Sequence, residues 1–147
     1  MPKLRYERDD VYRVSCQSNM KRIAFSIMEV FKNNGDKYPP AKRWLDFYNP
    51  YQENVPYYKC PSVKDADGYG YAFNSKLSEK SRDTLVRAKF KAESVVLLYE
   101  TTDLNRNAYG TGENPAFRHQ NGANYAFADG HVKWFPKTQT PSFKLKP

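Results

Sequence analysis

The chain has 147 residues, a length typical of a single domain that buries its own core, and we treat residues 1–147 as one domain. Its two cysteines exclude a disulfide-rich miniprotein and a zinc ribbon with four cysteine ligands, and no apolar run is long enough to span a membrane. The formal net charge is +8, yet residues 47–132 carry ten basic and ten acidic side chains, so the excess lies at the two ends. Such ends are typical of solvated tails or of arms that bind an anionic partner.

Residues 9–33 are predicted to form one long helix, because they contain neither Pro nor Gly. Apolar residues recur mostly at spacings of three and four, which places on one predicted stripe Val14, Cys16, Met20, Ile23, Ala24, Ile27, Met28 and Phe31. Gly35 follows two asparagines and suits a left-handed helix cap. A helix of this length spans about 36 Å, so we expect one end to project from the body.

Residues 37–74 are rich in Pro, Tyr and Asn, which excludes long helices. Their many aromatic rings favour an ordered loop packed on the long helix, with Trp44, Leu45 and Phe47 pointing inward. A short strand is predicted at residues 69–73, and weak helical character follows around residues 79–88.

The strongest strand signal is the apolar, β-branched run at residues 94–99, which is predicted to be central. A hairpin is predicted around Asp129 and Gly130 as a two-residue turn. That turn would place on one buried face Tyr125, Phe127, Val132 and Trp134. The tail at residues 136–147 is expected to be extended. The expected fold class is α+β: a long N-terminal helix packed on a small antiparallel sheet formed by about residues 94–135.

Histidines and carboxylates cluster late in the chain. His119 and His131 flank Asp129, and Glu100 ends the central strand, so His119, Asp129 and Glu100 are candidate metal ligands. Their spacing matches no zinc signature, and we predict no metal or other cofactor. The favoured interpretation is structural: Asp129 caps the hairpin and His119 hydrogen-bonds a nearby backbone group. No catalytic residues stand out, and we predict that the chain is not an enzyme.

Cys16 on the helix and Cys60 in the loop could form a disulfide, or they could remain two buried thiols. A bridge would close a loop of roughly 45 residues and stabilise the fold by about 4 kcal/mol in the chain-entropy model. The acidic run at residues 65–68 lacks the closing Glu of a calcium loop and is interpreted as a turn.

Five motifs resemble those of bacterial type II secretion pseudopilin-like proteins with the prepilin-type processing-associated domain. In chain order they are C-Q-S-N-M-K-R-I from residue 16, Y-P-P from residue 38, Y-K-C-P-S from residue 58, Y-G-Y from residue 69 with Asn74, and H-X9-DG-H at residues 119–131, with Arg118 just before it. The resemblance implies a pilin-like fold in which Arg118, His119, Asp129, Gly130 and His131 are structural motif residues. Family members also carry an apolar membrane anchor, which this sequence lacks. The simplest interpretation is that an anchor preceding Met1 has been removed, and the alternative is a natural relative without an anchor.

The expected function is that of a structural subunit of a type II secretion or type IV pilus-like system. The full-length form would be exported, anchored in the inner membrane and located in the periplasm or at the cell surface. Its expected partners are other pilin-like subunits, contacted through the N-terminal helix. We expect no nucleic-acid partner and identify no small-molecule substrate. The alternative is a surface domain that binds anionic polysaccharide or DNA through its basic ends.

Overall fold

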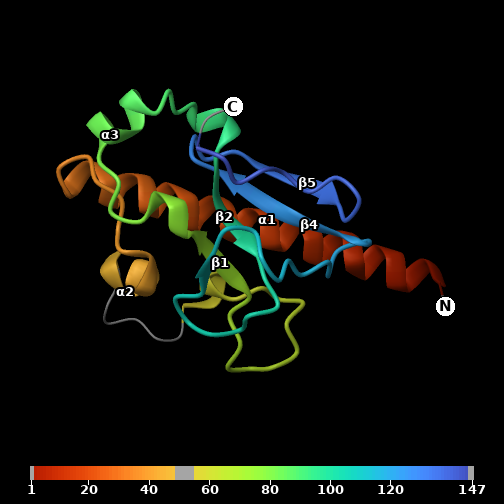
Figure 1. The fold of residues 1–147 in the computed structure, drawn as a ribbon. Coiled ribbons are helices and arrows are strands. Elements are labelled where there is room, and N and C mark those ends of the chain that lie inside the picture. Colours follow the sequence, from red (N-terminus) through yellow and green to blue (C-terminus); the bar gives the residue numbers. More distant parts are fainter. Residues whose placement is uncertain (1, 49–54, 146–147) are drawn as a thin grey trace.

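A long helix and a five-stranded sheet form the body of the protein (Figure 1). The computed structural model describes residues 2–48 and 55–145, and the side chains of residues 9–47 and 55–145. The helices are α1 (Pro2–Asn33), α2 (Trp44–Tyr48) and α3 (Arg82–Arg87), joined by short 3-10 turns at Ala41–Arg43, Pro56–Tyr58, Ser75–Leu77 and Ala92–Ser94. The strands are β1 (Tyr71–Asn74), β2 (Val96–Glu100), β3 (Tyr109–Gly110), β4 (Gly122–Phe127) and β5 (Val132–Pro136).

Helix α1 confirms the predicted long helix and begins seven residues earlier, at Pro2. It ends before Gly35, whose φ of +64° is the predicted left-handed cap. One stripe of the helix is fully buried: Cys16, Met20, Ile23, Ala24 and Ile27. The expected burial of Val14 is wrong, since its side chain is 55% exposed. Val14 lies two positions before Cys16, about 200° around the helix axis at 3.6 residues per turn.

The N-terminal turns of α1 extend past the edge of the sheet, while its later turns lie against β4, β5 and β2 (Figure 1). Within the described part of the chain, no helix combines the length and the apolar composition that crossing a bilayer requires.

The sheet has the strand order β3-β1-β2-β4-β5, so β2 is central as predicted. Three of the pairings are antiparallel, but β3 runs parallel to β1, and the sheet is therefore mixed. The α+β class is confirmed, and the predicted antiparallel sheet is confirmed in part, because three pairings are antiparallel and the β1–β3 pairing is parallel. The predicted sheet boundary at residue 94 is also wrong, because β1 enters the sheet beside β2 at Tyr71. A two-residue strand such as β3 is too short to carry a periodic pattern.

The β4–β5 hairpin exists, but its predicted register is wrong by one residue. Ala126 pairs with Val132 and Tyr125 with Lys133, and the turn is closed by the Phe127 N–H, which donates to the His131 carbonyl at 2.8 Å. Gly130 has a φ of +95°, as in a turn that ends in a left-handed residue. The extra loop residue moves Val132 to the helix-facing core, while Tyr125 and Phe127 stay on the opposite face.

The Gly130→Ala variant is expected to lose about 1–2 kcal/mol of unfolding free energy, because alanine is strained at positive φ. Its Cβ would also lie 3.3 Å from atoms of Met28 and Phe25 in α1. Gly35→Ala is the control, since its φ is also positive but nothing lies within 4 Å of the added Cβ. Urea denaturation should show a larger loss for Gly130→Ala. Equal losses would mean that the contact of the added Cβ with α1 does not lower the unfolding free energy.

The aromatic loop and the tail both pack on the body. Trp44 and Leu45 are buried as predicted, and α3 is the predicted weak helix. The expected packing at residues 49–54 lies outside the described residues. The tail packs on the body through Phe143, which is 8% exposed and whose ring meets the Tyr99 ring edge-on at 4.9 Å. The outer face of the sheet is therefore covered by the chain itself.

Candidate functional site

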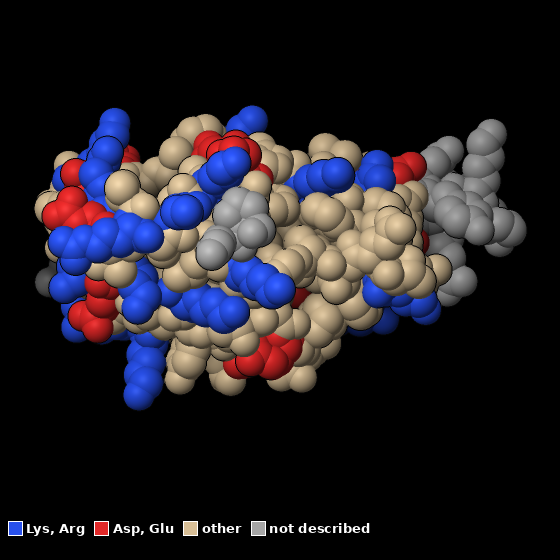
Figure 2. Space-filling view, turned by 45° about the horizontal axis from the view of Figure 1, so that its top comes forward, with Lys and Arg blue, Asp and Glu red and all other residues tan. Residues whose placement is uncertain are grey.

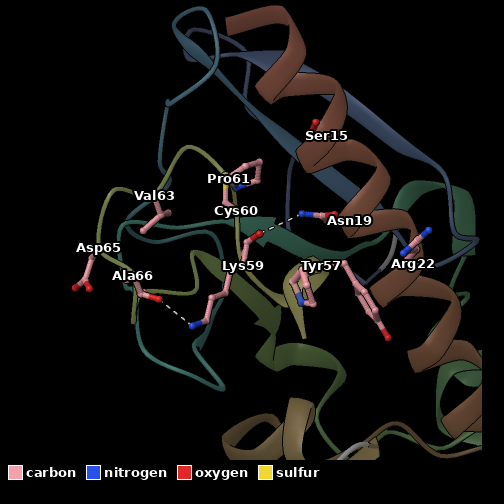
Figure 3. A pocket seen from close by; sticks show the side chains of 12 residues that line it. Ser15, Asn19, Arg22, Tyr57, Lys59, Cys60, Pro61, Val63, Asp65 and Ala66 are labelled. Atoms are coloured by element: carbon pink, nitrogen blue, oxygen red, sulfur yellow. Dashed lines mark hydrogen bonds between the residues drawn. The ribbon is translucent and has the colours of Figure 1, made fainter. Parts of the chain in front are cut away.

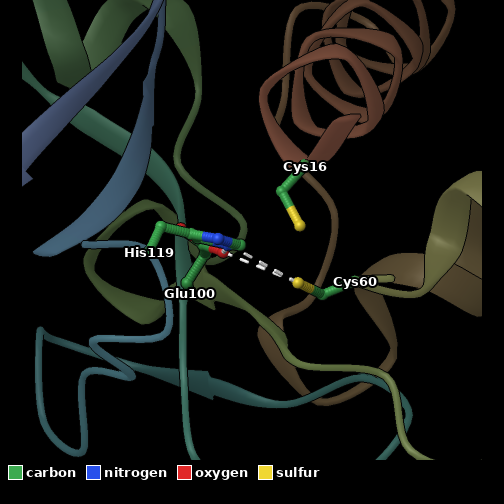
Figure 4. Close-up of side chains that lie close together, drawn as sticks. All are labelled: Cys16, Cys60, Glu100 and His119. Carbon is green, nitrogen blue, oxygen red and sulfur yellow. Dashed lines mark hydrogen bonds and ion pairs between the residues drawn. The ribbon is translucent and has the colours of Figure 1, made fainter. Parts of the chain in front are cut away.

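Four side chains of types that can ligate a metal come from distant parts of the chain and meet inside the protein (Figure 4). One comes from α1, one from the loop after the Pro56–Tyr58 turn, one from the end of β2, and one from the segment that leads into β4. We call this group the buried cluster, and it consists of Cys16, Cys60, Glu100 and His119. All four residues are at most 2% exposed. Their ligand atoms all lie within 4.8 Å of one another.

The contacts inside the buried cluster centre on His119 and Glu100. His119 Nε2 lies 2.6 Å from Glu100 Oε2, a hydrogen-bond distance, in a pair from which solvent is excluded. The Cys60 Sγ lies 3.7 Å from each of these two atoms. Figure 4 shows Cys16 pointing from α1 toward the same spot. A nitrogen, an oxygen and two sulfurs thus share one small, dry volume.

Neighbouring backbone and side chains hold Glu100 in place. The backbone N–H of Asn124 in β4 donates to Glu100 Oε1, which leaves Oε2 facing the cluster. A guanidinium nitrogen of Arg118 lies 3.9 Å from Oε2 and balances the buried negative charge. Arg118 also donates to the carbonyls of Thr101 and Gly70, both at 2.9 Å. These contacts tie the end of β2 to the start of β1.

The Cys60 loop is held against α1 by hydrogen bonds from both sides. The Asn19 amide, one turn after Cys16 on α1, donates to the Lys59 carbonyl at 3.1 Å. The Cys60 backbone N–H donates to the Tyr69 carbonyl at 2.9 Å. The helix and the segment leading into β1 therefore fix the position of the Cys60 thiol.

The ionisable groups of the buried cluster shift one another's pKa values. A hydrogen bond between the two thiols lowers the pKa of Cys60 to about 4 and raises the pKa of Cys16 above its ordinary value. Burial alone would lower the pKa of His119, but hydrogen bonds to Cys60 and Glu100 outweigh burial and raise it to about 9. Burial raises the pKa of Glu100, against the opposing hydrogen bond from His119. The ionised forms are stabilised by one another, by Arg118 and by the backbone N–H of Asn124.

The geometry does not fit a catalytic Cys–His–Glu triad. In such a triad one imidazole nitrogen takes the thiol proton while the other donates to the carboxylate. Here Cys60 and Glu100 both contact Nε2 of His119, whereas Nδ1 is buried with no partner among the described residues. Cys60 is also only 2% exposed, which keeps substrates away. The donor atoms instead suit a disulfide between the sulfurs or coordination of a metal ion.

The structure separates the residues that the sequence grouped as metal candidates. Asp129 lies on the exposed hairpin turn, where its carboxylate accepts the His131 backbone N–H at 3.1 Å and lies 2.5 Å from the His131 ring nitrogen. Asp129 therefore caps the hairpin, as predicted, and does not join the cluster of His119 and Glu100. The predicted backbone hydrogen bond of the His119 side chain is wrong, because its ring contacts Glu100 and Cys60.

Cys16 and Cys60 are present as two free thiols. Both side chains are buried, and the two sulfurs lie within 4.8 Å of each other. A disulfide between them stays a prediction. The sequence did not indicate that these cysteines and the His119–Glu100 pair form one site.

A groove of about 700 Å³ runs beside Cys60, between α1 and the loop at residues 56–68 (Figure 3). Asn19 and Arg22 line its α1 side, and Tyr57 and Lys59 line its loop side. Figure 3 shows Lys59 turned away from α1, where its ammonium donates to the Ala66 carbonyl at 2.9 Å. The groove brings solvent up to the loop that carries Cys60.

The basic side chains do not form one uniform surface on the face that Figure 2 displays. Lys and Arg are interspersed there with Asp and Glu, most densely toward the end of the molecule where α3 lies. Several arginines pair with acids, among them Arg13 with Asp10 at 3.6 Å and Arg82 with Asp36 at 3.1 Å. Such pairing reduces the charge available to a polyanion.

What the buried cluster does must be inferred from its own geometry. Comparisons of the chain with protein-family models, with curated proteins and with solved structures found no match.

Proposed function

We propose that this chain is a structural, non-enzymatic subunit of a pilin-like assembly, of the kind used in type II secretion or type IV pilus-like systems. The observation that carries the proposal is the division of α1 into two parts. Its first turns extend past the edge of the sheet and its later turns lie against the sheet (Figure 1), and next to the first turns the outward face of α1 carries exposed apolar side chains. The five ordered sequence motifs support the same function.

The outward face of α1 near its N-terminal end offers a surface for a neighbouring subunit. Val11 is 60% exposed and Val14 is 55% exposed, and the two lie three residues apart on the same side of the helix. Tyr12 beside them is 38% exposed. Exposed apolar side chains on a projecting helix favour helix–helix packing, because association removes them from water.

The proposal also implies a cellular location and partners. The subunits that this chain resembles assemble through their N-terminal helices and are anchored in the inner membrane by an apolar segment. The full-length protein is therefore proposed to be exported, anchored in that membrane and exposed to the periplasm or cell surface. Its partners are other pilin-like subunits.

The test is cross-linking in cells that produce the product of the full-length gene. We expect a membrane-associated protein that cross-links into a ladder of multimers. Replacing Val11 and Val14 together by Glu should weaken the ladder at least about tenfold, because two charges cannot be buried in a helix–helix contact without a large desolvation cost. Membrane fractionation and immunoblotting measure both results.

The matched control is Val86→Glu on α3, because Val86 is 69% exposed but lies off the proposed surface. It should leave the ladder unchanged. A gene product that is neither membrane-associated nor cross-linked would overturn the proposal. An equal loss in the Val86→Glu variant would remove the assignment of the surface to α1.

A further inference from the structure

We propose that the buried cluster binds one zinc ion and that this metal site holds α1, the Cys60 loop and the sheet together. The proposal concerns the folded body of the protein and does not depend on the pilin-like function. It rests on the convergence of the four ligands, on their chemistry, and on the charge that surrounds them.

The two distances from the Cys60 sulfur match a tetrahedral site. Bonds of about 2.3 Å to sulfur and about 2.0–2.1 Å to nitrogen or oxygen separate a sulfur from either lighter ligand by about 3.6 Å across a tetrahedron. The Cys60 Sγ lies 3.7 Å from His119 Nε2 and 3.7 Å from Glu100 Oε2. The 2.6 Å contact between the nitrogen and the oxygen would lengthen by roughly 0.7 Å as the metal replaces the proton between them.

The types of ligand select the metal. Two thiolates, an imidazole and a carboxylate are a mixed set of sulfur, nitrogen and oxygen donors, which suits zinc. Calcium and magnesium prefer sites made only of oxygen. Four protein ligands fill the tetrahedron, and their residues are at most 2% exposed, so no position is left for a reacting water. The site is therefore structural and not catalytic.

The charges balance when the metal is bound. The thiol protons and the proton on Nε2 leave to solvent while Nδ1 carries the remaining ring proton, so that zinc, two thiolates, a carboxylate and a neutral imidazole together carry a charge of −1. Arg118, 3.9 Å from Glu100 Oε2, supplies the compensating positive charge. The Asn124 N–H on Oε1 keeps the other carboxylate oxygen directed at the metal. The groove beside Cys60 provides an entry path.

A disulfide would use only part of this arrangement. It needs the two sulfurs and no other side chain, and it would leave Glu100 and His119 as an isolated buried pair. A disulfide does not explain why both groups lie within 4.8 Å of the sulfurs, whereas a metal ion would draw all four ligand atoms together. For this reason the geometry favours the metal site.

The direct test is metal binding to the reduced, folded protein. The purified chain is reduced, incubated with excess Zn²⁺ and passed through a desalting column, and its metal content is measured by mass spectrometry. We expect about one equivalent per chain. A parallel titration with Co²⁺ should saturate at about one equivalent and show the intense visible bands of a tetrahedral site together with thiolate-to-cobalt charge transfer.

Variants assign the ligands. Cys60→Ser and His119→Ala should each lower metal affinity by at least about tenfold, and Cys60→Ser should also weaken the charge-transfer band. Glu100→Gln keeps the shape of the side chain and should weaken binding similarly while its circular dichroism matches that of the wild type. His131→Ala is the matched control, since this exposed histidine lies outside the buried cluster and the variant should bind like the wild type.

Three results would overturn the proposal. The first is less than about a tenth of an equivalent of metal in the folded, reduced protein. The second is binding that Cys60→Ser and His119→Ala leave unchanged. The third is a purified protein that shows no reactive thiols when it is denatured without reductant and that still binds no metal after reduction, which would identify the cysteine pair as a disulfide.

Discussion

Glu100→Ala is expected to destabilise the metal-free protein by about 3–5 kcal/mol, because it removes one partner of a buried ion pair. The side chain is fully buried, and its two oxygens accept the Asn124 N–H and contact His119 Nε2. Without the carboxylate, the Asn124 N–H loses this acceptor in the core and His119 Nε2 keeps only its 3.7 Å contact with the Cys60 sulfur. Urea denaturation in the presence of a chelator measures the loss and keeps it separate from any effect of metal.

Two controls separate burial from charge. Glu100→Gln keeps an acceptor oxygen for the backbone N–H and should cost less than Glu100→Ala. Glu93→Ala changes an exposed carboxylate and should stay within about 0.5 kcal/mol of the wild type. If Glu100→Ala were as mild as Glu93→Ala, the His119–Glu100 pair would not contribute to stability.

Trp44→Ala is expected to cost about 3–5 kcal/mol of unfolding free energy, as large-to-small changes of buried aromatic residues do. Trp44 is 1% exposed, and its ring lies stacked 6.1 Å from the Phe73 ring of β1. Its indole N–H donates to the Ala108 carbonyl at 2.8 Å. The residue thus connects the aromatic loop to the parallel edge of the sheet. The midpoint of urea denaturation at a constant slope measures the change.

Trp44→Phe is the matched variant, because it keeps a buried ring and removes the indole N–H. The lost hydrogen bond should lower the unfolding free energy by about 1 kcal/mol, and the smaller volume of the phenyl ring should lower it further. The Ala108 carbonyl keeps a second donor, the Phe73 N–H at 2.9 Å, and is not left unpaired. Equal losses for the alanine and phenylalanine variants would show that the ring contributes little by its burial.

Local patterns in the sequence were sufficient for the elements whose signals are continuous. Helix α1, its cap at Gly35 and the central strand β2 follow from spacing and composition alone. The register of the hairpin could not be predicted, because two-residue and three-residue turns both place Asp and Gly at its tip. Strand β3 and the packing of Phe143 depend on partners that lie far away in the chain.

The residues of the candidate site were each visible in the sequence, but their grouping was not. The two cysteines were considered as a pair, and Glu100 was considered with His119 and Asp129. No spacing rule joins residues 16, 60, 100 and 119, since each lies on a different element.

By itself the sequence determined the long helix, the central strand and the α+β class, because a single element's own periodicity decides which of its faces is buried. Only the tertiary structure decided that Asp129 stays at the surface while two thiols, a carboxylate and an imidazole share one dry volume. The physical reason is that α1 packs against β2 and against the turn that precedes Cys60, which brings these segments together around the end of β2. The convergence of these side chains depends on how the elements pack against one another, and a local sequence pattern does not predict that packing.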